Sequence, residues 1–132
     1  MDEFTVETKR RMEMIDITDR VNGIVRGTGV ERGICLVFVP HTTAAVTINE
    51  NADPDVPADI IATLGALIPE HGGYRHAEGN SDAHLKSSLV GASETVIVEG
   101  GRLVLGTWQS LFFCEFDGPR RRKVQVTIIP GR

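Results

Sequence analysis

The sequence lacks the features that mark several large protein classes. Its 132 residues contain no apolar run near the roughly 20 residues of a membrane-spanning helix, and its start, Met-Asp-Glu-Phe, shows no signal-peptide pattern. It also lacks a basic excess, because 14 Lys and Arg against 18 Asp and Glu give a net charge of −4. Proteins that bind duplex nucleic acid usually carry such an excess. We therefore expect a cytoplasmic protein that binds neither membranes nor nucleic acid.

Cysteine is scarce as well. The two cysteines, Cys35 and Cys114, each lie inside an apolar run, which predicts buried thiols rather than a disulfide or a metal-binding pair. No repeat, low-complexity tract or long linker divides the chain, and 41% of its residues are hydrophobic. A chain of this length forms one domain, residues 1–132, that buries about two thirds of its unfolded surface.

The spacing of apolar residues predicts about three helices and six or seven strands. The helices are expected to begin near Thr18 or Asp19, near Asp53 or Asp55, and near Ser81 or Asp82, with Leu85 and Leu89 of the third packing inward. Strands are expected over residues 4–11, 33–39, 41–49, 94–98, 102–105, 107–116 and 123–129, the last four as an antiparallel meander. This order predicts an α+β fold, with a largely antiparallel sheet and the helices on one face.

The stretch from Tyr74 to Lys86 has an unusual concentration of chemistry-bearing side chains. It holds two of the four histidines, His76 and His84, together with Glu78, Asn80 and Asp82. Such a loop is typical of a site that binds a cation or moves a proton.

A third histidine, His41, is placed by strand alternation on the same face as polar residues. The neutral imidazoles of His41, His76 and His84 can fill three positions of a tetrahedral zinc site and leave the fourth open for water or substrate. Each histidine taken alone is more typical of a surface or capping residue, whereas the three together favour a shared site. His71, after the second helix, is expected to face solvent.

The strand over residues 107–116 provides further polar candidates. Gln109, Glu115 and Asp117 share one side of it with Leu111 and Phe113, so that side is expected to be mostly covered. A covered carboxylate requires a cation or a hydrogen-bond donor, which makes Glu115 a candidate acid–base or metal-supporting residue. The alternative is a half-buried strand whose polar side meets solvent.

A basic turn, Arg120-Arg-Arg-Lys, follows Asp117-Gly-Pro. Guanidinium groups suit phosphate, because their planar fork donates two hydrogen bonds to an oxyanion. The turn could equally balance nearby acids and keep a sheet edge from pairing. The candidate substrate- or phosphate-binding residues are Asn80, Lys86, Gln109, Asp117 and Arg120.

Together these stretches resemble the YjbQ-like family, also known as secondary thiamine-phosphate synthases. The residues that carry the likeness are Pro40-His-Thr-Thr-Ala-Ala-Val-Thr-Ile-Asn-Glu-Asn, Asp53-Pro-Asp-Val, Tyr74-Arg-His-Ala-Glu-Gly-Asn-Ser-Asp-Ala-His-Leu-Lys, Leu105-Gly-Thr-Trp-Gln and Cys114-Glu-Phe-Asp-Gly-Pro-Arg-Arg-Arg. The resemblance implies a compact α+β fold, a homotrimer, and a metal held by histidines near subunit contacts, with His41, His76, His84 and Arg120 at matching positions.

The resemblance also implies an activity, the weak formation of thiamine phosphate from a pyrimidine methyl diphosphate and a thiazole phosphate. The expected partner is therefore a small phosphorylated molecule. Histidine ligands favour zinc, whereas diphosphate chemistry more often uses magnesium on carboxylates and waters. Two alternatives follow from the residues: a zinc-type hydrolase in which Glu78 or Glu115 activates a metal-bound water, and a non-catalytic module that binds a metal or a phosphorylated metabolite.

Overall fold

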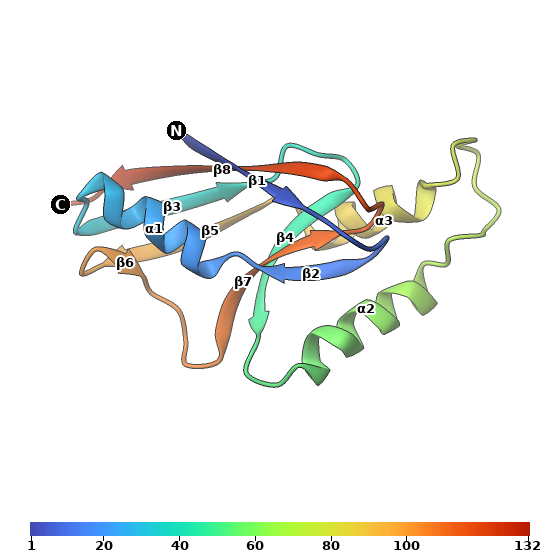
Figure 1. Cartoon of the computed structure of the whole chain (residues 1–132), viewed down its shortest axis with the longest axis horizontal. Coiled ribbons are helices and arrows are strands. Elements are labelled where there is room, and N and C mark those ends of the chain that lie inside the picture. Colours follow the sequence, from blue (N-terminus) through green and yellow to red (C-terminus); the bar gives the residue numbers. More distant parts are fainter.

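A computed structural model describes all of residues 1–132 as three helices and eight strands (Figure 1). The strands are β1 (Asp2–Glu7), β2 (Glu13–Asp16), β3 (Arg32–Phe38), β4 (Ala44–Glu50), β5 (Ser93–Glu99), β6 (Arg102–Leu103), β7 (Gln109–Glu115) and β8 (Arg121–Pro130). The helices are α1 (Thr18–Thr28), α2 (Asp55–Leu67) and α3 (Ser81–Val90). None of these helices is both long and apolar enough to cross a membrane.

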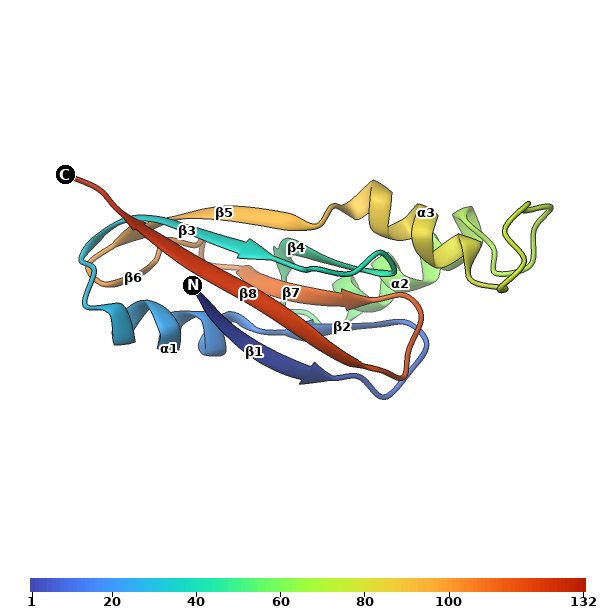
Figure 2. The same ribbon diagram turned by 90° about the horizontal axis from the view of Figure 1, so that it is seen from above.

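The strands form two antiparallel sheets, which confirms the predicted α+β class. Five strands pair in the order β1-β8-β3-β5-β6, and Figure 2 shows β5, β3, β8 and β1 in sequence across the view. The other three pair in the order β2-β7-β4. The predicted meander is therefore wrong beyond the β5–β6 hairpin. β7 leaves for the second sheet, and β8 returns to the first between β1 and β3.

The main core lies between the two sheets and α1. β3 and β8 direct Cys35, Val37, Val124 and Val126 inward, where they meet Val46, Leu111 and Phe113 from the second sheet and Val21 and Val25 from α1. These side chains are all fully buried. Burial of apolar side chains on this scale is the dominant stabilising contribution to a domain of this size.

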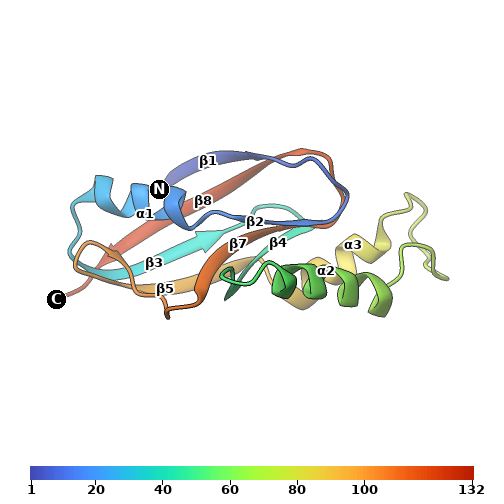
Figure 3. The same ribbon diagram turned by 60° about the horizontal axis from the view of Figure 1, so that its bottom comes forward.

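A smaller core covers the opposite face of the three-stranded sheet. Phe112, Cys114 and Phe116 pack there with Ala83 of α3 and Leu64 of α2. Figure 3 shows α2 and α3 at the end of the molecule that holds β2, β4 and β7. Because Cys35 belongs to the main core and Cys114 to this one, both thiols are buried and free, as predicted.

Helix α3 has the opposite orientation to the one predicted. Leu85 and Leu89 are exposed, by 48% and 62%, whereas Asp82 and Lys86 are fully buried. The prediction failed because apolar residues were assumed to mark the inner face. The inner face instead holds an ion pair four residues apart, with Lys86 Nζ 2.6 Å from Asp82 Oδ2.

The outer face of the five-stranded sheet carries an uncovered apolar patch. Ile34, Phe38, Ile97 and Ile129 alternate with the core residues of β3, β5 and β8, and each is at least 40% exposed. Ile34 is paired with Ile97 on one side and with Ile129 on the other, so the three form a continuous patch.

Candidate functional site

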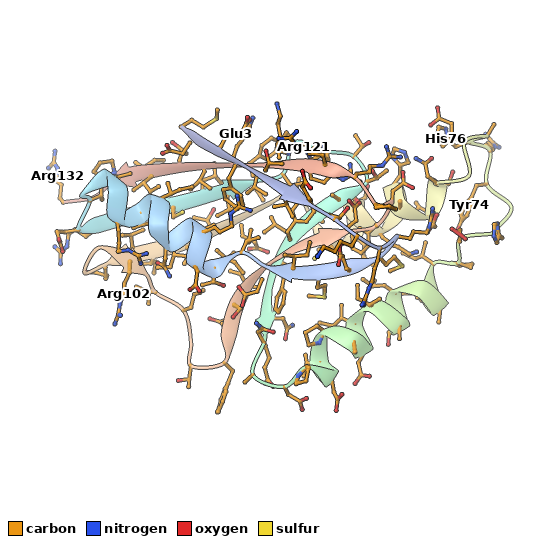
Figure 4. All side chains as sticks on the ribbon, viewed as in Figure 1. Glu3, Tyr74, His76, Arg102, Arg121 and Arg132 are labelled. Atoms are coloured by element: carbon orange, nitrogen blue, oxygen red, sulfur yellow. The ribbon has the colours of Figure 1, made fainter.

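The loop between α2 and α3 carries the histidine-rich stretch and projects from one end of the molecule. Figure 4 shows Tyr74 and His76 on this loop, at the end opposite Arg102 and Arg132. The hydroxyl of Tyr74 donates to the carbonyl of Pro69 at 2.6 Å, and this bond closes the near side of the loop.

Arg11 fastens both ends of the loop to the body of the protein. Its guanidinium lies 2.6 Å from Glu70, 2.9 Å from Asp82 and 3.3 Å from Asp117. Glu70 precedes the histidines, and Asp82 stands in the first turn of α3. Burial alone would raise the pKa of Asp82, but hydrogen bonds and charges from Lys86 and Arg11 outweigh burial and lower it.

His76 and His84 approach each other directly. Their ring centroids are 5.4 Å apart and the rings stand nearly perpendicular, at 83°. Two imidazoles on one tetrahedral zinc, with Zn–N bonds of about 2.0 Å, place their centroids about 5 Å apart, a separation close to that of this pair. Nε2 of His76 also lies 3.6 Å from the Glu78 carboxylate.

His41, the predicted third metal ligand, does not lie on a strand as expected. β4 begins at Ala44, so His41 lies in the loop before the strand. Its Nε2 accepts a hydrogen bond from the backbone N–H of Lys123 at 2.9 Å. Burial, and then the charge of Arg122, lower the pKa of His41 and favour the neutral ring. No group of three or more His, Cys, Asp or Glu side chains in the chain is arranged to hold a metal.

Two cavities meet at His84. One, of about 310 Å³, is lined by His76, His84, Tyr74 and Arg75 among others. The second, also of about 310 Å³, lies between His84 and Ser87 of α3 and His41 and Thr42 of the β3–β4 loop. His84 therefore lines both, and the three predicted histidines border two neighbouring cavities without converging on one point.

Glu115 is buried in an ion pair with Arg122. Arg122 donates to it through Nε at 2.9 Å and Nη2 at 2.5 Å, and the Thr8 hydroxyl donates at 2.8 Å. Arg122 Nη2 also donates to the hydroxyl of Thr43 at 2.8 Å. Glu115 is therefore covered and paired with a cation, while its acid–base role stays a prediction. The pair holds the β3–β4 loop, and with it His41, against β8.

The predicted phosphate-binding residues are mostly engaged within the protein. Asp117 accepts from Asn80 Nδ2 at 3.0 Å and from Arg120 Nη2 at 2.9 Å, and Lys86 is buried against Asp82. The Arg120 side chain is nevertheless 51% exposed, so part of its guanidinium faces solvent.

Gln109 lies far from the histidines. It opens β7 opposite Glu50, whereas Glu115 closes β7 opposite Ala44. Six residues of strand span about 20 Å. Gln109 accepts from the N–H of Gly106 at 2.8 Å and so closes its own turn.

Three residues that the sequence interpretation missed shape this region. Arg11 pairs with the carboxylate of Glu70 and Arg122 with that of Glu115. Ser87 lines the second cavity. Arg122 could have been found, because it shares strand parity with the core residues Val124 and Val126. Arg11 lies in an irregular segment between β1 and β2, where no periodicity indicates its direction.

The family model for UPF0047 protein YjbQ-like matches residues 2–131, almost the entire chain. The chain belongs to the YjbQ-like family. Among relatives of this family, UPF0047 protein YugU of Bacillus subtilis is 54% identical over 125 residues, which cover 94% of this chain and 95% of YugU. UPF0047 protein MJ1081 of Methanocaldococcus jannaschii is 53% identical over 126 residues, or 96% of this chain and 91% of that protein.

Solved structures of YjbQ-like proteins share the fold. A conserved protein of the YjbQ/UPF0047 family from Clostridium acetobutylicum superposes with a TM-score of 0.96 at 53% identity, covering 98% of this chain and all of that one. A protein from Sulfolobus solfataricus gives a TM-score of 0.94 at 38% identity, covering 98% and 96%. The names of these YjbQ-like proteins state no activity, so a function has to rest on the chemistry of the site.

Proposed function

We propose that this YjbQ-like protein acts in the cytoplasm on a small phosphorylated molecule, at the region that His41, His76 and His84 surround. A divalent metal, zinc by the nature of its ligands, would bind the His76–His84 pair. The observation that carries the proposal is the position of His84, which faces its partner His76 in one cavity and His41 in the next. His84 would then bind the metal in the first cavity and line the substrate pocket formed by the second.

The reaction we propose is thiamine-phosphate formation. The thiazole nitrogen forms a bond to the methyl carbon of the pyrimidine, and the carbon–oxygen bond to the diphosphate breaks. Arg120 supports this reaction, because half of its side chain is exposed beside the loop and a guanidinium stabilises the departing diphosphate. A bound metal would add positive charge for the same phosphate oxygens; magnesium could serve this purpose in place of zinc.

Metal analysis of protein purified without a tag tests the proposed metal site at His76 and His84. We expect stoichiometric metal in the native protein and its loss in His76→Ala and His84→Ala. His71→Ala is the matched control, because the His71 side chain is 94% exposed. Equal metal in all four proteins would contradict the shared metal site.

The rate of thiamine-phosphate formation tests the proposed reaction. Removing Arg120 or His84 should lower the rate at least about tenfold, the scale of a lost transition-state contact. Arg121→Ala is the control, since the Arg121 side chain is 76% exposed and its guanidinium is 3.9 Å from Glu7. An unchanged rate in Arg120→Ala and His84→Ala would contradict the synthase proposal.

A zinc-type hydrolase is the second candidate, favoured by the contact between His76 and Glu78. Glu115 is engaged with Arg122, so the base in this candidate is Glu78, which is 75% exposed beside the histidine. Glu78→Gln should then abolish hydrolysis of a phosphate ester while the metal is retained. Metal and ligand binding with no turnover of either substrate would indicate the non-catalytic module.

A homotrimer is part of the proposal. The apolar patch of Ile34, Ile97 and Ile129 supports it, because monomeric proteins rarely leave a large contiguous apolar surface exposed. The occupant we propose for this face is a second copy of the chain.

A further inference from the structure

Ser87 has a buried hydroxyl without a partner. The residue is 8% exposed, and its Oγ is one of two buried polar side-chain atoms in the protein that form no hydrogen bond. It lies on the inner face of α3 and lines the cavity that also holds His41 and His84. A buried hydroxyl is normally satisfied, so a free one at the wall of a cavity needs a partner from outside the chain, such as a water, an ion or a ligand group.

His41 contributes a second donor to the same cavity. The backbone N–H of Lys123 can only donate, so Nε2 of His41 has to be the unprotonated nitrogen of the neutral ring. The proton is then on Nδ1. This nitrogen cannot give a lone pair to a metal while it carries a proton, but it can donate a hydrogen bond to an acceptor.

The remainder of the lining favours a negatively charged acceptor. None of the eight lining residues is acidic, and Thr42 and Ser88 bring two more hydroxyl groups. An N–H donor and several hydroxyls around a cavity without carboxylates complement the oxygens of a phosphate group.

We propose that this cavity is an oxyanion subsite in which His41, through Nδ1–H, and Ser87, through its hydroxyl, hold a phosphate group of the substrate. The inference rests on the proposed function, and it makes His41 a phosphate ligand beside a metal that His76 and His84 hold. The assignment differs from the predicted set of Asn80, Lys86, Gln109, Asp117 and Arg120. In this arrangement His84 lies between the phosphate group and the metal and contacts both.

Calorimetric titration of the protein with inorganic phosphate tests the subsite, first as purified and again after removal of metal with a chelator. Ser87→Ala should weaken phosphate binding about tenfold in both preparations, the scale of a lost hydrogen bond to a charged group. It should leave the folded state intact, because Oγ has no partner within the protein. Thr107→Ala, which removes an exposed hydroxyl from the β6–β7 loop, is the control and should bind phosphate normally.

Two His41 variants separate a donor from a metal ligand. Gln can accept from Lys123 and donate through its amide, so His41→Gln should retain more phosphate affinity than His41→Ala. Zinc content should be the same in both. Equal phosphate affinity in Ser87→Ala and Thr107→Ala, or loss of zinc in His41→Gln, would overturn the subsite. These outcomes are distinct from the failure of the proposed function, in which His76→Ala and His84→Ala keep their metal and their turnover.

Discussion

The guanidinium of Arg122 and the carboxylate of Glu115 are joined by two hydrogen bonds, of 2.9 and 2.5 Å, in the interior of the protein. Glu115 is fully buried and Arg122 is 5% exposed. The same guanidinium holds Thr43, two residues after His41, and the next residue of β8, Lys123, donates its N–H to His41. A buried charge pair therefore positions one wall of the proposed phosphate subsite.

Arg122→Met should destabilise the protein by about 3–5 kcal/mol, because it leaves Glu115 buried without its cation. Urea unfolding measures this change. Arg121→Met is the control and should change the free energy of unfolding by less than about 1 kcal/mol, since Arg121 forms only a long, exposed contact with Glu7. Similar losses in the two variants would mean that the buried pair is not structurally important.

The Asp82–Lys86 pair should make the free energy of unfolding depend on pH under acidic conditions. Because the pKa of Asp82 is lowered in the folded protein, its contribution is fully present above the unfolded pKa near 3.8. That contribution is lost as the pH falls through the lowered folded value. The free energy of unfolding of the native protein should thus decline, as the pH falls below about 4, more steeply than that of Asp82→Asn. Asp59→Asn, at an exposed position of α2, should follow the native profile.

Both thiols should be unreactive in the folded protein. Burial raises the pKa of Cys35 to about 11 and that of Cys114 to about 12, so neither forms appreciable thiolate at neutral pH. A thiol reagent such as iodoacetamide should modify neither residue in native buffer and both in concentrated urea. Rapid modification of Cys35 without denaturant would show that the main core opens more readily than its packing indicates.

The apolar patch on the five-stranded sheet should control assembly. Ile97→Lys places a charge in the apolar patch, where Ile97 is 59% exposed in the single chain, and it should reduce the species in solution to the mass of one chain. Light scattering after gel filtration measures this mass. Leu67→Lys, at the end of α2 where Leu67 is 67% exposed, is the control. A native protein that is already monomeric would contradict the proposed homotrimer.

Local patterns predicted the helices and most of the strands, but not the short strand β2 or the way the strands are distributed between sheets. Helix starts near Thr18 and Asp55 followed from the spacing of apolar residues, a signal that lies within a few positions of the chain. The expected caps were wrong, because Ile17 and Pro54 occupy the N-cap positions and no side chain caps either helix. The assignment of β7 to a second sheet depends on contacts with β2 and β4, which lie more than 50 residues away. Nothing in the alternation of residues 107–116 distinguishes one sheet from another.

At the candidate site, too, local sequence predicted some features, and others depend on distant contacts. The concentration of polar residues between Tyr74 and Lys86 singled out the loop that carries His76 and the start of α3 that carries His84, and these two rings lie close together. Hydrophobicity alone misplaced Leu85 and Leu89, because the inner face of α3 is decided by a charge pair with a distant partner, Arg11. The role of Ser87 was invisible in sequence, since a lone serine gives no signal until its surroundings are known.

The protonation of the His41 ring tests the account most directly. Nitrogen-15 NMR distinguishes the two neutral forms of histidine, and the exposed His71 provides an internal reference. We predict a neutral His41 ring with its proton on Nδ1, whose resonance shifts when inorganic phosphate is added while that of His71 does not. A proton on Nε2, or a His41 ring that responds to zinc and not to phosphate, would contradict the phosphate subsite and return His41 to the metal site.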